Sequence, residues 1–305
     1  MNSARQELDA PTKLVGFVVG IAFLFLAALF VGDKIGPDAQ ATAAASHTGH
    51  DAHDAHDEPA AVPAGLQATQ DGYTLELDRS VVESGPEVPV TFTISEPDGS
   101  ALTDYDVMHT EELHLIVVRR DLTDFQHVHP TRDASGRWST ALDLIRPGPY
   151  RLFADFTPTG GENITLGAEL TVPGDYRPQP LSAQPLSTQP PSTPNVTSRV
   201  DGYTVMLAGA VTAGENSTVS LTIDQNGREV TDLEPYLGAY GHLVALRADD
   251  LAYLHVHPED GPPGPTVDFT VDAPTAGTYA LYLDFQHQGV VHTAEFTIEA
   301  QEGGA

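Results

Sequence analysis

The sequence predicts an all-β protein: two tandem Ig-like or cupredoxin-like β-sandwich domains that follow a single N-terminal transmembrane helix. Three observations support this prediction. A seventeen-residue phrase occurs twice, at residues 114–130 and 242–258. Each copy lies in a longer unit of short apolar segments separated by Gly, Pro, Asp and Asn, which is the pattern of strands joined by turns. A run of nineteen residues without a charge precedes both units.

The uncharged run, LVGFVVGIAFLFLAALFVG at residues 14–32, is long enough to cross a hydrocarbon core of ~30 Å as a helix. Arg5 and Lys13 precede it and give a weak positive-inside bias. We therefore predict a single-pass anchor in the cell membrane, with both domains extracytoplasmic. The alternative is a signal peptide that is cleaved near the Ala-rich residues 41–46, which would give a secreted protein.

The repeat is longer than the shared phrase. One unit begins with DGYTLEL at residue 71 and the other with DGYTVML at residue 201, and each is roughly a hundred residues, a usual size for a domain with its own core. The tract between them is rich in Pro, Ser, Thr and Gln, which favours a semi-rigid spacer. The predicted division is a membrane anchor at 1–36, a disordered His/Asp/Ala-rich tether at 37–66, a first β-sandwich at 67–173, a Pro-rich linker at 174–198, a second β-sandwich at 199–300 and a tail at 301–305.

Strands are expected where apolar residues alternate with polar ones or where β-branched and aromatic residues gather. No helical periodicity follows the anchor. In the first unit the expected strands are 88–94, 113–118, 138–144, 150–156 and 166–172; in the second they are 217–223, 242–246, 266–271, 279–285 and 290–298.

Composition excludes several classes of function. A formal net charge of −29 argues against nucleic-acid binding, because the phosphate backbone requires a basic face. The sequence contains no cysteine, so no disulfide holds the domains together. Blue-copper centres, zinc ribbons and cysteine nucleophiles are excluded for the same reason.

The repeated phrase carries a histidine pattern. Each copy has one histidine, twelve further residues, and then His-x-His-Pro. Imidazole is the commonest protein ligand for transition metals, so the two triads are candidate metal sites. They are His114, His127 and His129 in the first unit and His242, His255 and His257 in the second.

The triads fit a hairpin. Pairing about the loop centred on residues 120–123 puts His114 opposite His129 and His127 opposite Ile116, whereas a shift of two residues puts His114 opposite His127. The same pairing in the second copy puts His242 opposite His257 and His255 opposite Val244. In either register the three imidazoles share one face of the hairpin, because a strand has a side-chain period of two.

Other residues are candidates beside the triads. Asp155 and Asp284 occupy matching positions and are candidates to ligate a metal or to orient a histidine. The predicted tether contains histidines at every third position, which line one side of a polyproline II segment and favour capture of divalent metals. They are His47, His50, His53 and His56. The alternative is a mobile tether whose charge changes near pH ~6.5.

The phrases HLIVVRRDLTDFQHVHP and HLVALRADDLAYLHVHP resemble a motif of bacterial exported β-sandwich proteins described as YtkA-like, FixH-like or secreted heavy-metal-associated. The resemblance covers both units. It implies an extracytoplasmic Ig-like domain linked to copper or another transition metal. Similar folds occur in CopC-type copper carriers.

The resulting functional hypothesis is a membrane-anchored protein that binds transition-metal ions, copper first and zinc as the alternative, for buffering, delivery or resistance. An envelope metal-handling protein is the expected partner. We expect no catalysis, because no nucleophile motif accompanies the histidines. The main alternative is a non-metal cell-envelope interaction module in which the histidines are structural. A metal-dependent oxidase or hydrolase would need an open coordination position and a substrate cleft.

Overall fold

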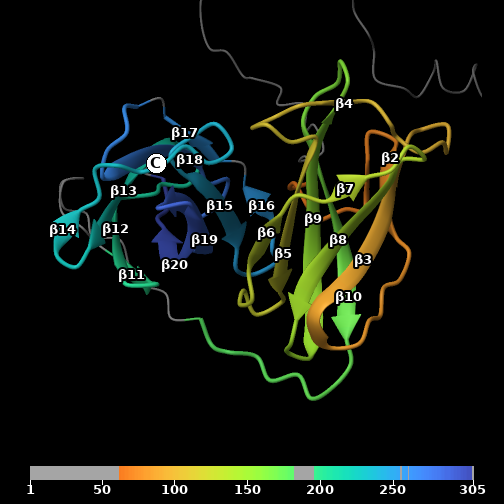
Figure 1. The fold of residues 1–305 in the computed structure, drawn as a ribbon, viewed down its shortest axis with the longest axis horizontal. Coiled ribbons are helices and arrows are strands. Elements are labelled where there is room, and N and C mark those ends of the chain that lie inside the picture. Colours follow the sequence, from red (N-terminus) through yellow and green to blue (C-terminus); the bar gives the residue numbers. More distant parts are fainter. Residues whose placement is uncertain (1–61, 182–195, 255, 260, 304–305) are drawn as a thin grey trace, which may run out of the picture. The chain divides into compact units, whose positions relative to one another are not determined.

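The computed structural model describes residues 62–181, 196–254, 256–259 and 261–303. These residues form strands, turns and loops without a helix, so the all-β prediction for the two domains is confirmed (Figure 1). Among them no helix is long and apolar enough to span a membrane. The predicted anchor and the tether histidines His47, His50, His53 and His56 lie outside the described residues.

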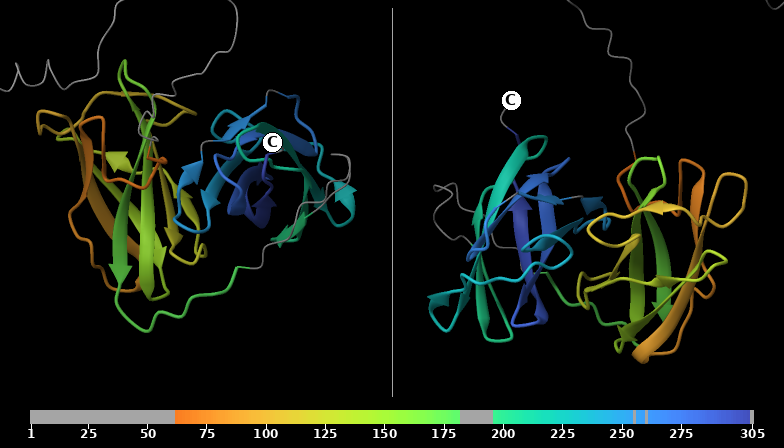
Figure 2. Two further views of the ribbon diagram at one scale, coloured as in Figure 1. Left: turned by 180° about the vertical axis from the view of Figure 1, so that it is seen from behind. Right: turned by 45° about the horizontal axis from the view of Figure 1, so that its top comes forward.

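The first domain consists of two antiparallel sheets, which Figure 2 shows from two further directions. One sheet has the order β1 (Thr69–Gln70), β2 (Tyr73–Leu77), β3 (Gly85–Ser95), β8 (Arg137–Leu144) and β7 (Thr131–Arg132). The other has the order β10 (Ile164–Val172), β9 (Gly148–Pro158), β5 (Leu113–Arg119) and β6 (Gln126–Val128), with β4 (Tyr105–Asp106) paired to β9.

The second domain repeats this arrangement. One sheet has the order β11 (Val196–Val200), β12 (Tyr203–Gly209), β13 (Asn216–Gln225), β18 (Thr266–Asp272) and β17 (Val256–Pro258), with β14 (Arg228–Glu229) paired to β13. The other has the order β16 (Tyr253–Leu254), β15 (His242–Arg247), β19 (Gly277–His287) and β20 (Val290–Ala300). All ten strands expected from the sequence are present and extend beyond the expected bounds at one end or both. The strands that were not expected are β1, β2, β4, β7, β11, β12 and β14.

The strand order is that of an immunoglobulin constant-type sandwich. If β2, β3, β5, β7, β8, β9 and β10 are lettered A to G in chain order, the sheets read A-B-E-D and G-F-C. A tyrosine near the start of the sixth strand supports this assignment, because its hydroxyl bonds back to the chain in a tyrosine corner. Tyr150 donates to the Arg146 carbonyl at 2.9 Å, and Tyr279 donates to the Thr275 carbonyl at 2.8 Å.

Each domain has its own hydrophobic core between its two sheets. In the first, Phe92 and Ile94 of β3 face Leu115 and Val117 of β5, and all four side chains are buried. The same alternation builds the second core from residues such as Phe269 of β18. Each fully buried side chain of this size stabilises the fold by about 1.5–3 kcal/mol, so no disulfide is needed.

A third apolar cluster joins the two domains. Every residue of β5 is buried. The side chains of Ile116 and Val118 point away from the first core. They pack instead with Val244 and Leu246 of the second domain. The described residues belong to one compact unit. Strands that are buried on both faces read as continuous apolar runs, as HLIVV and HLVAL do.

The contact between the domains follows the internal repeat. Phe125 stacks on Tyr282 with ring centroids 4.0 Å apart, and Phe153 packs on Tyr253 at 5.6 Å. Phe125 corresponds to Tyr253 in the repeat, and Phe153 corresponds to Tyr282. The two contacts are therefore equivalent with the domains exchanged, as in an isologous dimer interface.

The chain before β1 also packs against the domains. The Gly65 N–H donates to the Thr165 carbonyl at 2.9 Å, and the Gly65 carbonyl accepts from Arg151. Gly65 has a φ of +74°, and a Cβ there would lie 2.5 Å from the Phe153 ring. This position therefore requires glycine.

Candidate metal centre

The β5–β6 hairpin brings the first histidine triad together. Ile116 pairs with His127 and Leu115 with Val128, which confirms the register that puts His127 opposite Ile116. His114 and His127 therefore share the face of the hairpin that carries Ile116 and Val118. His129 follows the end of β6 by one residue.

The three imidazoles converge. One ring nitrogen from each of His114, His127 and His129 lies within 4.8 Å of the other two. His114 Nδ1 and His127 Nε2 are 3.0 Å apart. Two nitrogens bound to one tetrahedral zinc ion at ~2.0–2.1 Å are about 3.3 Å apart, so the arrangement needs little adjustment to hold an ion.

The outer nitrogens of two of these rings are held by oxygen acceptors. His127 Nδ1 lies 2.8 Å from Asp284 Oδ2, and His114 Nε2 lies 3.1 Å from the Met108 carbonyl. A carboxylate and a carbonyl only accept, and a neutral imidazole carries one N–H. With both rings neutral, the N–H of His127 is on Nδ1 and that of His114 on Nε2, and the two nitrogens that face each other then both carry lone pairs.

His129 adds a third imidazole. Its Nε2 is buried and has no hydrogen-bond partner among the described residues. An unpaired buried polar atom costs about 1–3 kcal/mol, and two lone pairs that face each other also repel. A cation bound between His114 Nδ1 and His127 Nε2 would remove that repulsion, and one that also bound His129 Nε2 would remove both penalties.

His114 and His129 are neutral at neutral pH. Burial, reinforced by the neighbouring imidazole of His127, lowers the pKa of His114 to about 4. The same two causes, with His114 and His242 also contributing, lower the pKa of His129 to about 3. Neutral imidazole is the form that binds metal, so these groups are ready to ligate at neutral pH.

The second domain contributes His242 to the same region. Its Nε2 donates to the Tyr236 carbonyl at 2.8 Å, which leaves Nδ1 as an acceptor. Burial and the nearby histidines lower its pKa to about 4 despite that carbonyl. The ring of His109 lies 5.1 Å from that of His242 and 6.0 Å from that of His114.

The second predicted triad is described only in part. Ala245 pairs with Leu254 and Leu246 with Tyr253, which is the register expected from the sequence. His255 and the side chain of His257 lie outside the described part of the structure. The second triad therefore stays a prediction.

The two matching aspartates lie beside the first histidine of each phrase. Asp155 is the cross-strand partner of His114, and Asp284 is that of His242. Asp155 accepts from Asn163 and from Thr165, both in its own domain. Asp284 accepts from Thr293 at 2.6 Å and also from His127 of the other domain.

Sequence reasoning missed the contact between His127 and Asp284 and the position of His109. No local pattern indicates that contact, because its partners lie 157 residues apart. His109 has no counterpart in the second unit and lies in a loop with a φ of +48°. The sequence does contain one signal for the contact between the domains. It is the continuous apolar run of β5, which indicates a strand buried on both faces.

A second group of histidines lies elsewhere in the second domain. His287 Nδ1 is 2.7 Å from the Tyr203 hydroxyl and its Nε2 is 3.2 Å from Asp232. His292 Nδ1 is 2.9 Å from Asp201. These rings have oxygen partners within their own domain, as structural histidines do.

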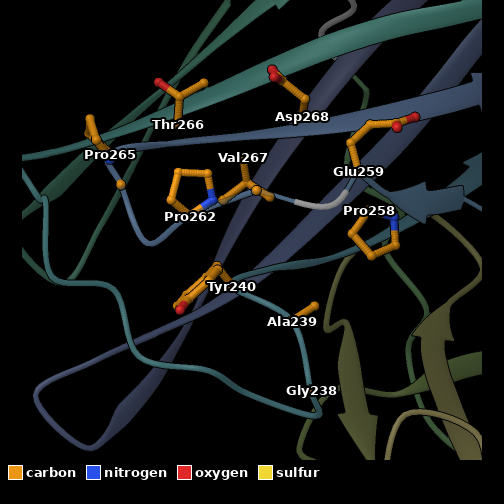
Figure 3. A pocket seen from close by; sticks show the side chains of 12 residues that line it. Gly238, Ala239, Tyr240, Pro258, Glu259, Pro262, Pro265, Thr266, Val267 and Asp268 are labelled. Carbon is orange, nitrogen blue, oxygen red and sulfur yellow. The ribbon is translucent and has the colours of Figure 1, made fainter.

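Two cavities were candidates for the route by which an ion reaches the histidine cluster. A cavity of about 140 Å³ borders His109, His114 and Asp155 and gives the cluster an opening. A larger open pocket of about 450 Å³ lies on the second domain, lined by Tyr240, Glu259 and Pro262 among others (Figure 3). None of the described histidines lines that pocket, so we assign it no part in the centre.

Residues 68–174 and 198–302 each match a family model described as Domain of unknown function (DUF8832). The chain belongs to this family. Its two DUF8832 domains are the two β-sandwiches, and the histidine triad lies on the first of them. No curated protein matches the chain.

Solved structures similar to the two DUF8832 domains include FdeC, an Escherichia coli adhesin, at 13% identity and a TM-score of 0.25, over 77% of this chain and 65% of that one. Yersinia pseudotuberculosis InvD is similar at 15% identity and a TM-score of 0.24, over 77% and 59%. The Ig1-2 module of Drosophila receptor protein tyrosine phosphatase DLAR has 7% identity and a TM-score of 0.21, over 76% and 99%. The chain spans less than two thirds of the first two, and scores of this size assign no function.

Proposed function

We propose that the protein binds a transition-metal ion through His114, His127 and His129. The observation that carries this proposal is the convergence of three imidazoles, with His114 Nδ1 and His127 Nε2 3.0 Å apart and the buried Nε2 of His129 without a partner among the described residues. A bound cation would give these three nitrogens the partner that they lack. Its outer nitrogens are held by oxygen acceptors, which is the usual arrangement around histidine ligands.

Copper is the first choice of metal and zinc the second. Imidazole sites suit Cu(II) and Zn(II), and copper heads the affinity order among divalent ions. The role we propose is buffering, delivery or resistance rather than turnover. The predicted anchor would hold the domains outside the cytoplasm. There His47, His50, His53 and His56 would capture ions and an envelope metal-handling protein would exchange them.

The second candidate function is a cell-envelope interaction module made of Ig-like domains, with structural histidines. The hydrogen bonds that His114, His127 and His242 already make favour it, because each occupies one ring nitrogen without any metal. The bond from His127 to Asp284 also joins the two domains. In that case the cluster is a part of the contact between the domains.

Calorimetric titration with Cu(II) and Zn(II) separates these functions. The protein to use is the full chain with His47, His50, His53 and His56 replaced by Gln, so that the tether contributes no ions. We expect saturable binding with submicromolar affinity, lost in the double variant His127→Ala, His129→Ala. His287→Ala is the control, because that ring lies in the other group of histidines. Absence of binding in the parent would leave the interaction module as the better account.

A further inference from the structure

We propose that the metal centre is shared between the two domains: Asp284 of the second domain holds His127 of the first in its metal-binding form, so that metal binding and domain docking stabilise each other. This inference rests on the proposed metal function. It assigns Asp284 as a positioning residue and makes the second domain a part of the first domain's site.

Asp284 is held rigidly enough for this role. It lies on β19 opposite His242 and is 2% exposed. Its Oδ1 accepts from Thr293 at 2.6 Å and its Oδ2 accepts from His127 Nδ1 at 2.8 Å. With the proton held on Nδ1, the Nε2 of His127 presents its lone pair to His114. Loss of such an outer partner typically weakens metal binding by 10–100-fold.

The docking surface lies on the same strand as the centre. Val118 of β5 and Leu246 of β15 belong to the apolar cluster between the domains and not to either domain core. Val118 is four residues from His114, about 13 Å along the strand. The surface can therefore be altered without touching a ligand or a core.

Coupling follows from this geometry. An ion that binds the intact centre more tightly than the first domain alone must favour the docked state by the same factor. Conversely, a substitution that separates the domains must weaken metal binding, although the three histidines are unchanged.

The first test uses Asp284→Asn in the full chain with the tether histidines replaced by Gln. We expect a 10–100-fold weaker Zn(II) affinity by calorimetry. Without metal, the ¹⁵N shifts of His127 should lose the signature of a proton fixed on Nδ1, which a purely structural role would not require. The matched control is Asp268→Asn, an exposed carboxylate of the same domain that accepts from Ser220. Parent-like affinity and tautomer in Asp284→Asn would overturn the positioning role.

The second test uses Val118→Glu, which places a charge in the apolar contact. We expect increased hydrogen exchange at the Tyr253 amide, whose bond to the Ala64 carbonyl reports docking, and at least tenfold weaker Zn(II) binding. Saturating Zn(II) should restore part of the protection. The control is Val81→Glu, where the valine is 56% exposed in the same domain.

The outcomes separate the two proposals. If the parent binds no Zn(II), the proposed function fails and the coupling with it. If the parent binds Zn(II) and Val118→Glu opens the contact without changing its affinity, the coupling alone is wrong. If Val118→Glu does not open the contact, the Zn(II) affinity of Asp284→Asn decides whether the second domain takes part in the site.

Discussion

His127 on the first domain and Asp284 on the second form a hydrogen bond of 2.8 Å between two side chains that are 6% and 3% exposed. This bond fixes which nitrogen of His127 faces the other imidazoles. It also belongs to the contact between the domains, together with the stacked rings of Phe125 and Tyr282. The same interaction therefore belongs both to the histidine cluster and to the contact between the repeats.

The substitution His129→Leu should separate function from stability. It removes a buried nitrogen that has no partner, so the metal-free protein should keep its free energy of unfolding or gain up to about 1 kcal/mol. Cu(II) and Zn(II) binding should be lost. Urea denaturation in the presence of a chelator, together with calorimetric titration, measures both effects. A clear loss of stability in the metal-free state would show that His129 is a structural residue.

The substitution Asp121→Asn should destabilise the first domain in a pH-dependent way. Burial by itself would raise the pKa of Asp121, but hydrogen bonds from Arg119, Gln179 and Thr123 outweigh it and hold the pKa well below its usual range. The side chains of Arg119 and Asp121 are 3% and 4% exposed, so breaking the pair should cost about 3 kcal/mol at neutral pH.

The sign of the pH effect follows from the lowered pKa. The stabilisation from Asp121 is present above the unfolded-state pKa of about 3.9 and is lost as the pH falls towards the folded-state value. The difference between parent and Asp121→Asn in urea denaturation should therefore shrink below about pH 4. Asp175→Asn, in an exposed pair with Arg177, should change stability little at any pH. A pH-independent difference would contradict the assignment.

The substitution Gly65→Ala should destabilise the protein by about 2 kcal/mol, because it combines left-handed backbone strain with a clash. The added Cβ would lie 2.5 Å from the Phe153 ring, which itself packs on Tyr253. Gly99→Ala is the matched control, since Gly99 has a φ of +85° and nothing within 4 Å of the added atom. Thermal unfolding of both variants isolates the clash. Equal losses of stability in the two variants would mean that residue 65 does not pack against Phe153.

The fold could be predicted in large part from local patterns. The alternation in 88–94 and 138–144 shows which side chains face a core, and β3 and β8 follow it. The hairpin register was decided by the structure, which places His127 opposite Ile116 and excludes the shift of two residues. Both registers keep the three imidazoles on one face, so the pattern alone did not distinguish them.

The sequence by itself determined the two all-β units, their repeat and the convergence of His114, His127 and His129 on one hairpin face, because strand periodicity and short-range pairing are local properties. Only the tertiary structure decided that this face meets the second domain, where His127 bonds to Asp284 and His242 lies close to His109. The physical reason is that an apolar strand face shows that this face is buried but does not show which surface covers it. That choice depends on the complementary fit of Val118 and Phe125 against residues more than a hundred positions away.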